Sequence, residues 1–449
     1  MNHSSTETQT KKIKASAVPV AIVIGGGIAG MQAALDIGDK GFKVLLIERE
    51  PTIGWLMAQL DKTFPTLDCS SCILTPKMVE VGSHPQIELM TCSEVTAVRG
   101  GVGDFQVTVK KKPRYVDLAK CTGCGLCSEA CVYGMKIPNE FDLGVGKRSA
   151  IYIPFPQAVP QKYLIDPNRC LMLTRGKCGK EPRCQRACGT GAIDFSQKEK
   201  TVTLRAAVIV VATGYDSFDA RLKPEYGYGR YENVLSGLEF ERLCSASGPT
   251  RGKIEVNGKE PKRVVFIQCV GSRDKTVGNE YCSRVCCMYT VKQAHLVRER
   301  IPDAKITICY MDIRAFGKGY EEFYNRVQGE RMIFRRGNPS EVYPKGECLI
   351  VRGEDTLLGI SYEEEADLVV LATGLVPRAD AQELAALLGL TQTPDGFFQE
   401  AETKETIATS RAGVFLAGCC QSPKDIPDTV AQASGAAALA CICFAQGGS

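Results

Sequence analysis

Residues 18–50 constrain the fold of this chain more than any other stretch. They read VPVAIVIGGGIAGMQAALDIGDKGFKVLLIERE, in which an apolar β-run, a helical pattern and a second β-run ending at Glu48 follow one another. Between the first β-run and the helix, Gly25, Gly27 and Gly30 have the G-x-G-x-x-G spacing. Such glycines permit a tight turn and a close approach of a pyrophosphate, while the terminal carboxylate can hold a ribose hydroxyl pair. The predicted dinucleotide-binding residues are Gly25, Gly27, Ile28, Ala29, Gly30, Glu48 and Arg49.

Three later β-runs indicate which dinucleotide binds. Residues 206–216 and 366–378 each run into Ala-Thr-Gly, and residues 412–419 form a third β-run that reaches a glycine. We expect all three to return to the first sheet, as in two-dinucleotide-binding-domain flavoproteins resembling thioredoxin reductase. In such proteins the first glycine motif holds FAD, so FAD is the expected cofactor. These runs add the predicted FAD-binding residues Ala212, Thr213, Gly214, Gly374 and Gly418.

Residues 251–362 form a second region with the strand and helix pattern of a nucleotide-binding domain, but cysteines replace its glycines. The strand VVFIQ is followed by a helix and by KITICYMDI, but the first connection carries Cys269, Cys282, Cys286 and Cys287. Without glycines a pyrophosphate loses its close backbone approach, so we expect no NAD(P)H site here. Four thiolates that converge can hold a 4Fe-4S cluster, which is the predicted role. The alternative is that these cysteines are small apolar core residues.

Eight further cysteines form an insert in the first domain. The chain has 22 cysteines and three histidines, so thiolates are the expected metal ligands. CTGCGLCSEAC has the C-x2-C-x2-C-x3-C spacing of 4Fe-4S ferredoxins, and a second, looser run follows. In two-cluster ferredoxins the fourth cysteine of each run ligates the other cluster. We assign one cluster to Cys121, Cys124, Cys127 and Cys188, and the other to Cys170, Cys178, Cys184 and Cys131. Zinc is the alternative, although zinc sites use paired C-x2-C motifs.

The predicted fold is therefore α/β: a thioredoxin-reductase-like flavoprotein with two dinucleotide-binding domains and an inserted two-cluster ferredoxin domain. The net charge of +4, spread along the chain, gives no reason to expect nucleic acid. The N-terminus lacks the apolar core of a signal peptide, and the apolar stretch 436–445 is shorter than the roughly 20 residues of a membrane span. We expect a cytoplasmic protein without a membrane span. The predicted segments are 1–17 (disordered), 18–115 (first segment of the FAD-binding domain), 116–194 (ferredoxin-like insert), 195–250 (second segment of the FAD-binding domain), 251–362 (second Rossmann-like domain with a cluster loop) and 363–449 (third segment of the FAD-binding domain).

Several longer motifs resemble the family of the A subunit of heterodisulfide reductase (HdrA). They are MAQLDKTFPTLDCSSCILTPKMVEV at 57–81, CTGCGLC, KRSAIYIPFPQAVP at 147–160, QCVGSRD and YCSRVCCMYT within 268–290, and SPKDIPDTVAQASGAA at 422–437. Together they extend through almost all of residues 20–440.

The resemblance implies an electron-transfer subunit that contains FAD and three 4Fe-4S clusters, one of them held by the long cysteine loop. It also implies partners: other iron-sulfur and flavin subunits of a heterodisulfide-reductase-like complex, and ferredoxin. A homodimer within the complex stays open. In some family members the flavin bifurcates electrons, and a similar subunit occurs in benzoyl-CoA reductase complexes of anaerobes. At 54–56 this chain reads Gly-Trp-Leu where relatives usually have Gly-Gly-Arg, which weakens the case for bifurcation.

Two features leave an alternative function open. Cys69 and Cys72 form a C-x-x-C, either a support for the FAD-binding loop or a dithiol of a free-standing flavin-dependent disulfide reductase. Near the C-terminus, the helix after the third strand is expected to direct its N-terminus at the flavin, with Asp428 or Thr429 as its N-cap. Lys424 is predicted to lie against the flavin and tune its potential, and Asp425 and Thr429 are predicted to bind the cofactor.

Overall fold

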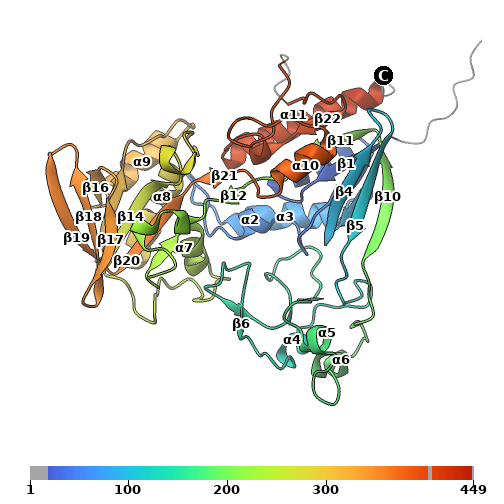
Figure 1. Ribbon diagram of the computed structural model, residues 1–449, viewed down its shortest axis with the longest axis horizontal. Coiled ribbons are helices and arrows are strands. Elements are labelled where there is room, and N and C mark those ends of the chain that lie inside the picture. Colours follow the sequence, from blue (N-terminus) through green and yellow to red (C-terminus); the bar gives the residue numbers. More distant parts are fainter. Residues whose placement is uncertain (1–18, 403–406, 447–449) are drawn as a thin grey trace, which may run out of the picture.

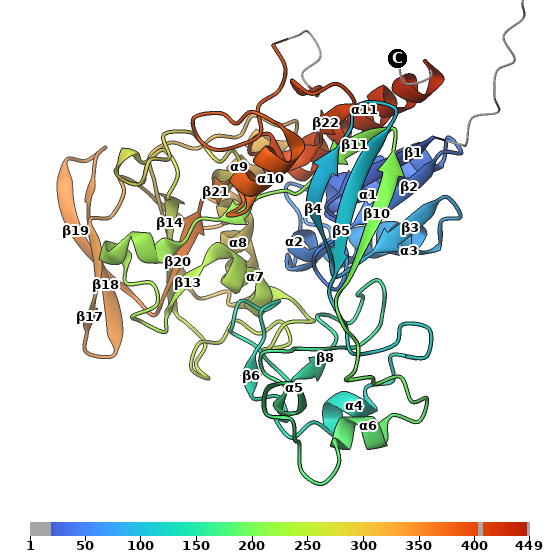
Figure 2. The same cartoon turned by 45° about the vertical axis from the view of Figure 1, so that its right-hand side comes forward.

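The computed structural model describes residues 19–402 and 407–446, and the segment predicted to be disordered, 1–17, lies outside them. Figure 1 shows two sheet-containing bodies side by side and a smaller body that lies apart from both sheets at one end of the molecule. The smaller body contains α4, α5 and α6, and the turned view of Figure 2 keeps it separate.

The first body is built on a five-stranded parallel sheet in the order β22-β11-β1-β2-β3. Side chains of β1 alternate between two cores: Ala21 and Val23 enter one, and Ile22 and Ile24 enter the other. Both faces are therefore buried, as parallel sheets require. The strands are β1 (Val20–Ile24), β2 (Lys43–Ile47), β3 (Ile87–Met90), β11 (Val208–Val211) and β22 (Val414–Leu416).

Helices cover one face of this sheet and an antiparallel meander covers the other. The meander has the order β10-β5-β4, and its outermost pair joins Lys111 to Lys200. The helices on the first face are α1 (Ile28–Gly38), α2 (Trp55–Ala58), α3 (Ser70–Ser83) and α11 (Ile426–Ala445); the second face has β4 (Ser93–Arg99), β5 (Phe105–Lys111), β10 (Lys200–Ala206) and α10 (Ala381–Leu388).

The apolar stretch 436–445 was expected to be too short to span a membrane, but helix α11, which contains it, is longer. In the described part of the chain it is the helix that, by length and composition alone, could cross a membrane. Its alanines, however, belong to the first core: Ala433, Ala436 and Ala440 are fully buried with residues of α1. One face of α11 is therefore part of the first core.

The second body is a five-stranded parallel sheet in the order β13-β20-β14-β15-β16. Helices α7, α8 and α9 pack on one face, and the antiparallel sheet β17-β18-β19 packs on the other. The elements are β13 (Val234–Ser236), α7 (Gly237–Cys244), β14 (Arg263–Val270), α8 (Cys286–Arg300), β15 (Lys305–Tyr310), α9 (Tyr320–Gln328), β16 (Ile333–Arg336), β17 (Glu341–Lys345), β18 (Cys348–Asp355), β19 (Ile360–Ala366) and β20 (Leu368–Thr373).

One strand prediction is wrong. The β-run of residues 366–378 was expected in the first sheet, but β20 is hydrogen-bonded between β13 and β14 of the second. The range 195–250, predicted to belong to the first domain, likewise contains β13 and α7 of the second body. The two bodies are joined where β12 (Asp216–Ser217) pairs antiparallel with β21 (Leu375–Val376).

The small body lies between β5 and β10 in the sequence and has little regular structure. A compact core in it includes Cys121, Cys127 and Cys170 together with Ile151 and Ile165. Its elements are α4 (Leu126–Glu129), β6 (Ile137–Pro138), β7 (Lys147–Arg148), β8 (Ile151–Tyr152), β9 (Leu164–Ile165), α5 (Leu171–Arg175) and α6 (Arg183–Ala187). Four short 3-10 helices elsewhere in the described residues are η1 (Ala220–Leu222), η2 (Pro224–Tyr226), η3 (Lys275–Val277) and η4 (Gly418–Cys420).

Candidate cofactor and cluster sites

The glycine turn between β1 and α1 contains two glycines required by packing and one that faces open space. Gly25 has φ +108°, and a Cβ on Gly30 would lie 1.8 Å from the carbonyl oxygen of Gly25. A Cβ on Gly27 would meet nothing within 4 Å. Gly27 is also the N-cap of α1 and supplies no side-chain hydrogen bond to its first amides. Free amides at a helix N-terminus beside open space fit a pyrophosphate. Ile28 and Ala29 begin this helix.

The end of β2 carries the carboxylate predicted for the ribose. Glu48 accepts hydrogen bonds from the amides of Gly26, at 2.5 Å, and Glu50, at 2.8 Å. Burial raises the pKa of Glu48, and these amides act in the opposite direction. Arg49 turns away from this turn to Asp380, at 2.5 Å, so its guanidinium is held by the protein rather than directed at the glycines.

The ends of β11 and β22 approach the same turn. A Cβ on Gly25 would lie 2.4 Å from the oxygen of Ala212 and 3.1 Å from the Cα of Thr213, while one on Gly214 would meet nothing within 4 Å. Gly418 has φ +77°, and a Cβ there would lie 2.9 Å from Ala29. The three strand ends thus converge on the open space at Gly27. Gly374 does not join them, because it directly follows β20 of the second sheet and packs against Ser272 and Ser283.

The N-cap of α11 differs from the prediction. Asp425, not Asp428 or Thr429, caps the helix and accepts the amide of Asp428 at 2.9 Å. The helix starts three residues earlier than expected because Pro427 is tolerated in a first turn. Asp425 also accepts the hydroxyl of Tyr320 at 2.6 Å, and Thr429 is buried in the first turn of the helix.

Lys424 lies in the loop before α11, between η4 and the Asp425 cap. Its Nζ donates to Gln421 and, at 2.7 Å, to the hydroxyl of Ser422. Burial lowers the pKa of Lys424, although Cys419 and Cys420 oppose this. The lysine is therefore half-buried and fixed near the end of β22, rather than a fully solvated surface residue.

Two cavities in the small body are each lined by four cysteines. One, of about 140 Å³, is lined by Cys121, Cys124, Cys127 and Cys188. Burial, followed by the proximity of the Cys121 thiol, raises the pKa of Cys127 to about 12. This quartet combines three cysteines of the first run with the last of the second, which is the grouping assigned from the sequence.

The other cavity, of about 20 Å³, is lined by Cys131, Cys170, Cys178 and Cys184. Burial, then the Cys170 and Cys131 thiols, raise the pKa of Cys184 to about 11. Cys131 belongs to the first run in the sequence but lies with the second quartet in space. Among the described residues, no three His, Cys, Asp or Glu side chains have the arrangement expected around a single metal ion; the cysteines instead surround spaces.

The long cysteine loop gathers a third quartet at the start of α8. Cys269 has φ +59° next to a register shift in β14, Cys282 lies in the loop, and Cys286 and Cys287 form the first turn of the helix. Burial, then Cys269, Cys287 and Cys282 in that order, raise the pKa of Cys286. The four thiols are therefore neighbours, and the helix N-terminus favours negative charge on them.

A small apolar cluster connects this loop with the end of β22. Val285, Leu375 and Cys419 are buried in it, and Tyr215 and Tyr289 pack against them. Burial, then Cys419 and Cys286, raise the pKa of Tyr215, so its ring lies near both. Neither Tyr215 nor Tyr289 stands out in the sequence as a site residue; the position of Tyr215, immediately after Gly214, is the available signal.

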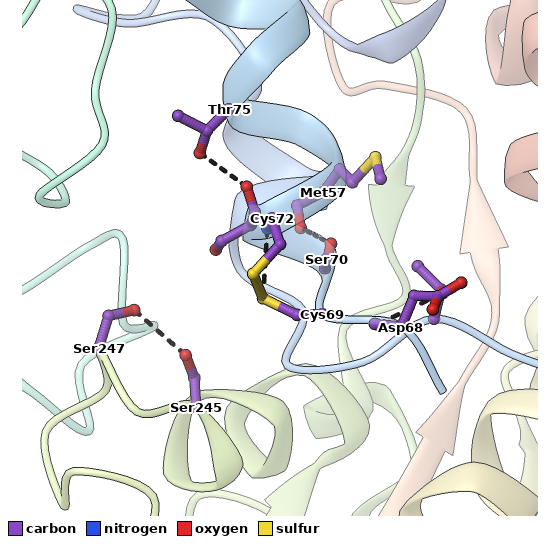
Figure 3. The surroundings of a disulfide bond; sticks show 10 residues. Met57, Asp68, Cys69, Ser70, Cys72, Thr75, Ser245 and Ser247 are labelled. Atoms are coloured by element: carbon purple, nitrogen blue, oxygen red, sulfur yellow. Dashed lines mark hydrogen bonds between the residues drawn. A yellow bond between two sulfur atoms is a disulfide. The ribbon is translucent and has the colours of Figure 1, made fainter. Parts of the chain in front are cut away.

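Cys69 and Cys72 form a disulfide at the start of α3 (Figure 3). Cys69 is the N-cap, and its Sγ accepts the amide of Cys72 at 3.2 Å. Ser70 donates to the carbonyl of Met57 at 2.6 Å and fixes the turn. Cys72 is exposed, so the bridge is open to reagents from solution.

Comparisons with known proteins agree with this arrangement. Residues 23–76 match the model of an NAD(P)-binding Rossmann-like domain. The chain is 55% identical over 433 residues to the iron-sulfur A subunit of the CoB–CoM heterodisulfide reductase of Methanocaldococcus jannaschii, covering 95% of this chain and 64% of that one. It is 52% identical over 443 residues to the A subunit of the H2:CoB–CoM heterodisulfide,ferredoxin reductase of Methanothermobacter marburgensis, covering 97% and 66%. The chain thus spans slightly less than two thirds of the length of these relatives.

Among solved structures, the thioredoxin reductase of Lactococcus lactis superposes with a TM-score of 0.54 at 15% identity, covering 95% of this chain and 99% of that one. The two parallel sheets and the superposition together define a thioredoxin-reductase-like fold with two domains of the dinucleotide-binding type. Within this class, the chain belongs to the HdrA family, that of the heterodisulfide reductase A subunits.

Proposed function

We propose that this chain is an electron-transfer subunit of a cytoplasmic, heterodisulfide-reductase-like oxidoreductase complex, with FAD at the glycine turn and three 4Fe-4S clusters. The observation that carries the proposal is that twelve cysteines gather as three quartets, two of them around cavities. FAD exchanges one or two electrons and each cluster exchanges one, which lets such a protein connect partners of different electron number.

The residues proposed to hold FAD are those around the open space at Gly27. The amides of α1 would face the pyrophosphate, and the Glu48 carboxylate would exchange an amide partner for ribose hydroxyls. Gly25, Gly30 and Gly418 allow the backbone segments to approach closely enough to form the turn.

The proposed cluster ligands are the three quartets. They are Cys121, Cys124, Cys127 and Cys188; Cys131, Cys170, Cys178 and Cys184; and Cys269, Cys282, Cys286 and Cys287. The third quartet supports a route between bodies, because Tyr215 lies near both Cys286 and Cys419.

We favour relay over bifurcation as the role of the flavin. Residues 54–56 read Gly-Trp-Leu, and Trp55 packs edge-on against Phe141 of the small body, with ring centroids 5.4 Å apart. This segment is therefore apolar and offers no cation to tune a flavin. The proposed partners are the other subunits of the complex and ferredoxin, in line with the ferredoxin in the name of the Methanothermobacter relative.

Iron and flavin analysis of protein purified without oxygen tests the proposal. We expect about 12 iron atoms per FAD, the sum of three 4Fe-4S clusters. Replacing Cys282 and Cys286 by serine should lower this to about eight. Cys348→Ser is the matched control, because Cys348 lies at the start of β18, outside the quartets. Zinc in place of iron, or an iron content that the double variant does not change, would contradict the ligand assignment.

A second test concerns the second body, which lacks a glycine-rich turn for a nicotinamide dinucleotide. Neither NADH nor NADPH should bleach the flavin, because cysteines occupy the connection between β14 and α8 where a pyrophosphate requires glycine. A reduced ferredoxin should bleach it. Rapid reduction by either nicotinamide would show that the second body has kept its hydride donor site.

The disulfide supports a second candidate, a flavin-dependent disulfide reductase that uses Cys69 and Cys72. In that reaction two electrons and two protons from reduced flavin would open the S–S bond to two thiols. Thiol titration after flavin reduction should then find two additional thiols in the parent and none in Cys72→Ser. An unchanged thiol content in the parent leaves the disulfide a structural support of α3.

A further inference from the structure

A group of cations gathers at the tip of the small body, although we expected the charge to be spread along the chain. Residues 170–188 contain five cations and one anion, Glu181. All five cations are exposed. None of them forms an ion pair with a carboxylate in the described part of the chain. We name as the basic rim the residues Arg175, Lys177, Lys180, Arg183 and Arg186.

Unpaired like charges so close together are not explained by folding. Arg352, by contrast, has the carboxylate partners Glu341 at 2.7 Å and Glu363 at 2.8 Å. Clustered cations without partners repel one another and weaken the local structure. α5 and α6, of five residues each, have little helix stability of their own to offset this repulsion. Because folding does not account for these unpaired cations, we infer that the basic rim serves to bind a partner.

The basic rim lies in the chain segment that carries three cysteines of the second quartet, Cys170, Cys178 and Cys184. Lys177 and Arg183 directly precede Cys178 and Cys184 in the sequence. Arg183 lines the same cavity as these two cysteines, so this cation lies at one proposed cluster site.

Apolar side chains are exposed next to the rim. Val132 is 40% exposed and lines the same cavity, Met135 is 58% exposed, and Leu126 is 51% exposed on α4 and lines the other cysteine cavity. An apolar centre with a charged edge is the composition of protein interfaces. α4, α5 and α6 lie together at the end of the molecule away from both large sheets, where a partner has free access (Figures 1 and 2).

We propose that the basic rim is the docking surface of a small acidic one-electron carrier protein of the ferredoxin type. The inference rests on the proposed function, since it assumes a cluster at the second quartet. The second quartet would hold the cluster that accepts one electron from the reduced carrier, an exchange that would transfer no proton and break no bond. Complementary charge steers such encounters and makes them depend on salt, which suits a transient redox contact of small area.

The position and spread of the cations favour a protein over a small anion. They extend over the end of α5, the loop and α6 rather than converging on one point, so no single phosphate contacts all of them. They also lie in the segment of a proposed redox site, where a nucleic acid would have no role in electron transfer.

Charge reversal with a matched control tests the docking surface. The rim variant is Lys177→Glu, Lys180→Glu and Arg183→Glu; the control is Lys253→Glu, Lys259→Glu and Lys262→Glu, three exposed lysines of the second body with the same change in charge. The probe is an oxidised acidic two-cluster ferredoxin, whose Kd is measured by calorimetry at low and at high salt. We expect the rim variant to raise the Kd at low salt at least about tenfold, with the control close to the parent.

Iron analysis of each protein separates the possible failures. If the parent lacks iron at the second quartet, the proposed function fails. If iron is present and the rim variant binds ferredoxin as the parent does, docking at the rim is refuted. Lys180→Glu with Arg186→Glu, which changes no residue adjacent to a cysteine, replaces the rim variant if that one loses iron, and it should also weaken binding. Binding of heparin but not of ferredoxin would identify a general polyanion site and overturn the proposal.

Discussion

Replacing Gly27 by alanine should separate cofactor binding from folding. Gly27 has φ −72°, which alanine adopts readily, and its new Cβ would meet no atom within 4 Å. The loss to folding is then limited to the poorer N-cap, about 0.5–1 kcal/mol. Gly30→Ala is the contrasting variant, because its Cβ would lie 1.8 Å from the carbonyl oxygen of Gly25. Such an overlap with backbone should lower the free energy of unfolding by about 3 kcal/mol or more.

Gly27→Ala should weaken FAD binding much more than it lowers stability. If the pyrophosphate occupies the space beside Gly27, a methyl group there overpacks the bound state by about 1–3 kcal/mol, which weakens FAD binding roughly 5- to 150-fold. Denaturant unfolding of flavin-free protein gives the stability of each variant, and fluorescence titration with FAD gives its affinity. Gly27→Ala should be nearly as stable as the parent and bind FAD poorly.

Two results would refute this reasoning. Parent-like FAD affinity in Gly27→Ala would show that the open space is not where the pyrophosphate approaches. Parent-like stability in Gly30→Ala would show that the turn can open without loss, so that the close approach at Gly25 does not hold α1 to β1.

Three further predictions concern charged side chains. Lys292→Met should destabilise the protein by about 3–5 kcal/mol in chemical unfolding, because Lys292 and Glu241 form a pair at 2.5 Å whose side chains are 1% and 2% exposed. The buried carboxylate would lose its cation and keep only hydrogen bonds from Gln293 and from the Asp61 amide. Full stability would mean that Glu241 takes up a proton at little cost. Lys424→Ala should lower the flavin midpoint potential by roughly 60 mV, equivalent to ~1.4 kcal/mol, because the variant removes a cation that favours reduced anionic flavin. A redox titration measures this potential, and overlapping titrations of variant and parent would place the lysine away from the flavin. Burial, followed by the nearby Glu48 carboxylate, raises the pKa of Glu50 from 4.5 to about 7, so the folded state binds more protons than the unfolded state between these pH values. The free energy of unfolding of flavin-free protein should therefore fall as the pH rises through that window. Glu50→Gln should remove this part of the pH dependence, and an unchanged profile would contradict the shift.

The sequence predicted both nucleotide-binding sheets but not the sheet of every strand. VIVV of β11 and LVVL of β20 are both fully buried runs that precede Ala-Thr-Gly. A strand buried on both faces reads as a continuous apolar run, which indicates a parallel sheet without indicating which one. Placement is decided by contacts distant in the sequence, such as those of β20 with β13 and β14.

The cysteine quartets illustrate what spacing does predict. The exchange of Cys131 and Cys188 between runs follows from the ferredoxin pattern, and the thiols do gather in that grouping. Lys292 illustrates the limit: a lysine on a helix of mixed polarity reads as a surface residue, and only the fold brings Glu241 to it. Asp425 was predicted to bind the cofactor, with Asp428 or Thr429 as the cap, whereas the structure begins α11 at Ile426 with Asp425 as its N-cap.

The chain leaves and re-enters the first body at two antiparallel junctions, Lys111 with Lys200 and Asp216 with Val376. At each junction the two ends of a large excursion are hydrogen-bonded neighbours, so a turn of a few residues could close the gap as a hairpin. The small body and the second body are thus insertions into one nucleotide-binding domain, and the buried pair of Arg242 with Asp142 links the two. Each could be excised, transplanted into another flavoprotein or used to place new termini, and the contact between Trp55 and Phe141 marks one apolar surface that excision of the small body would uncover.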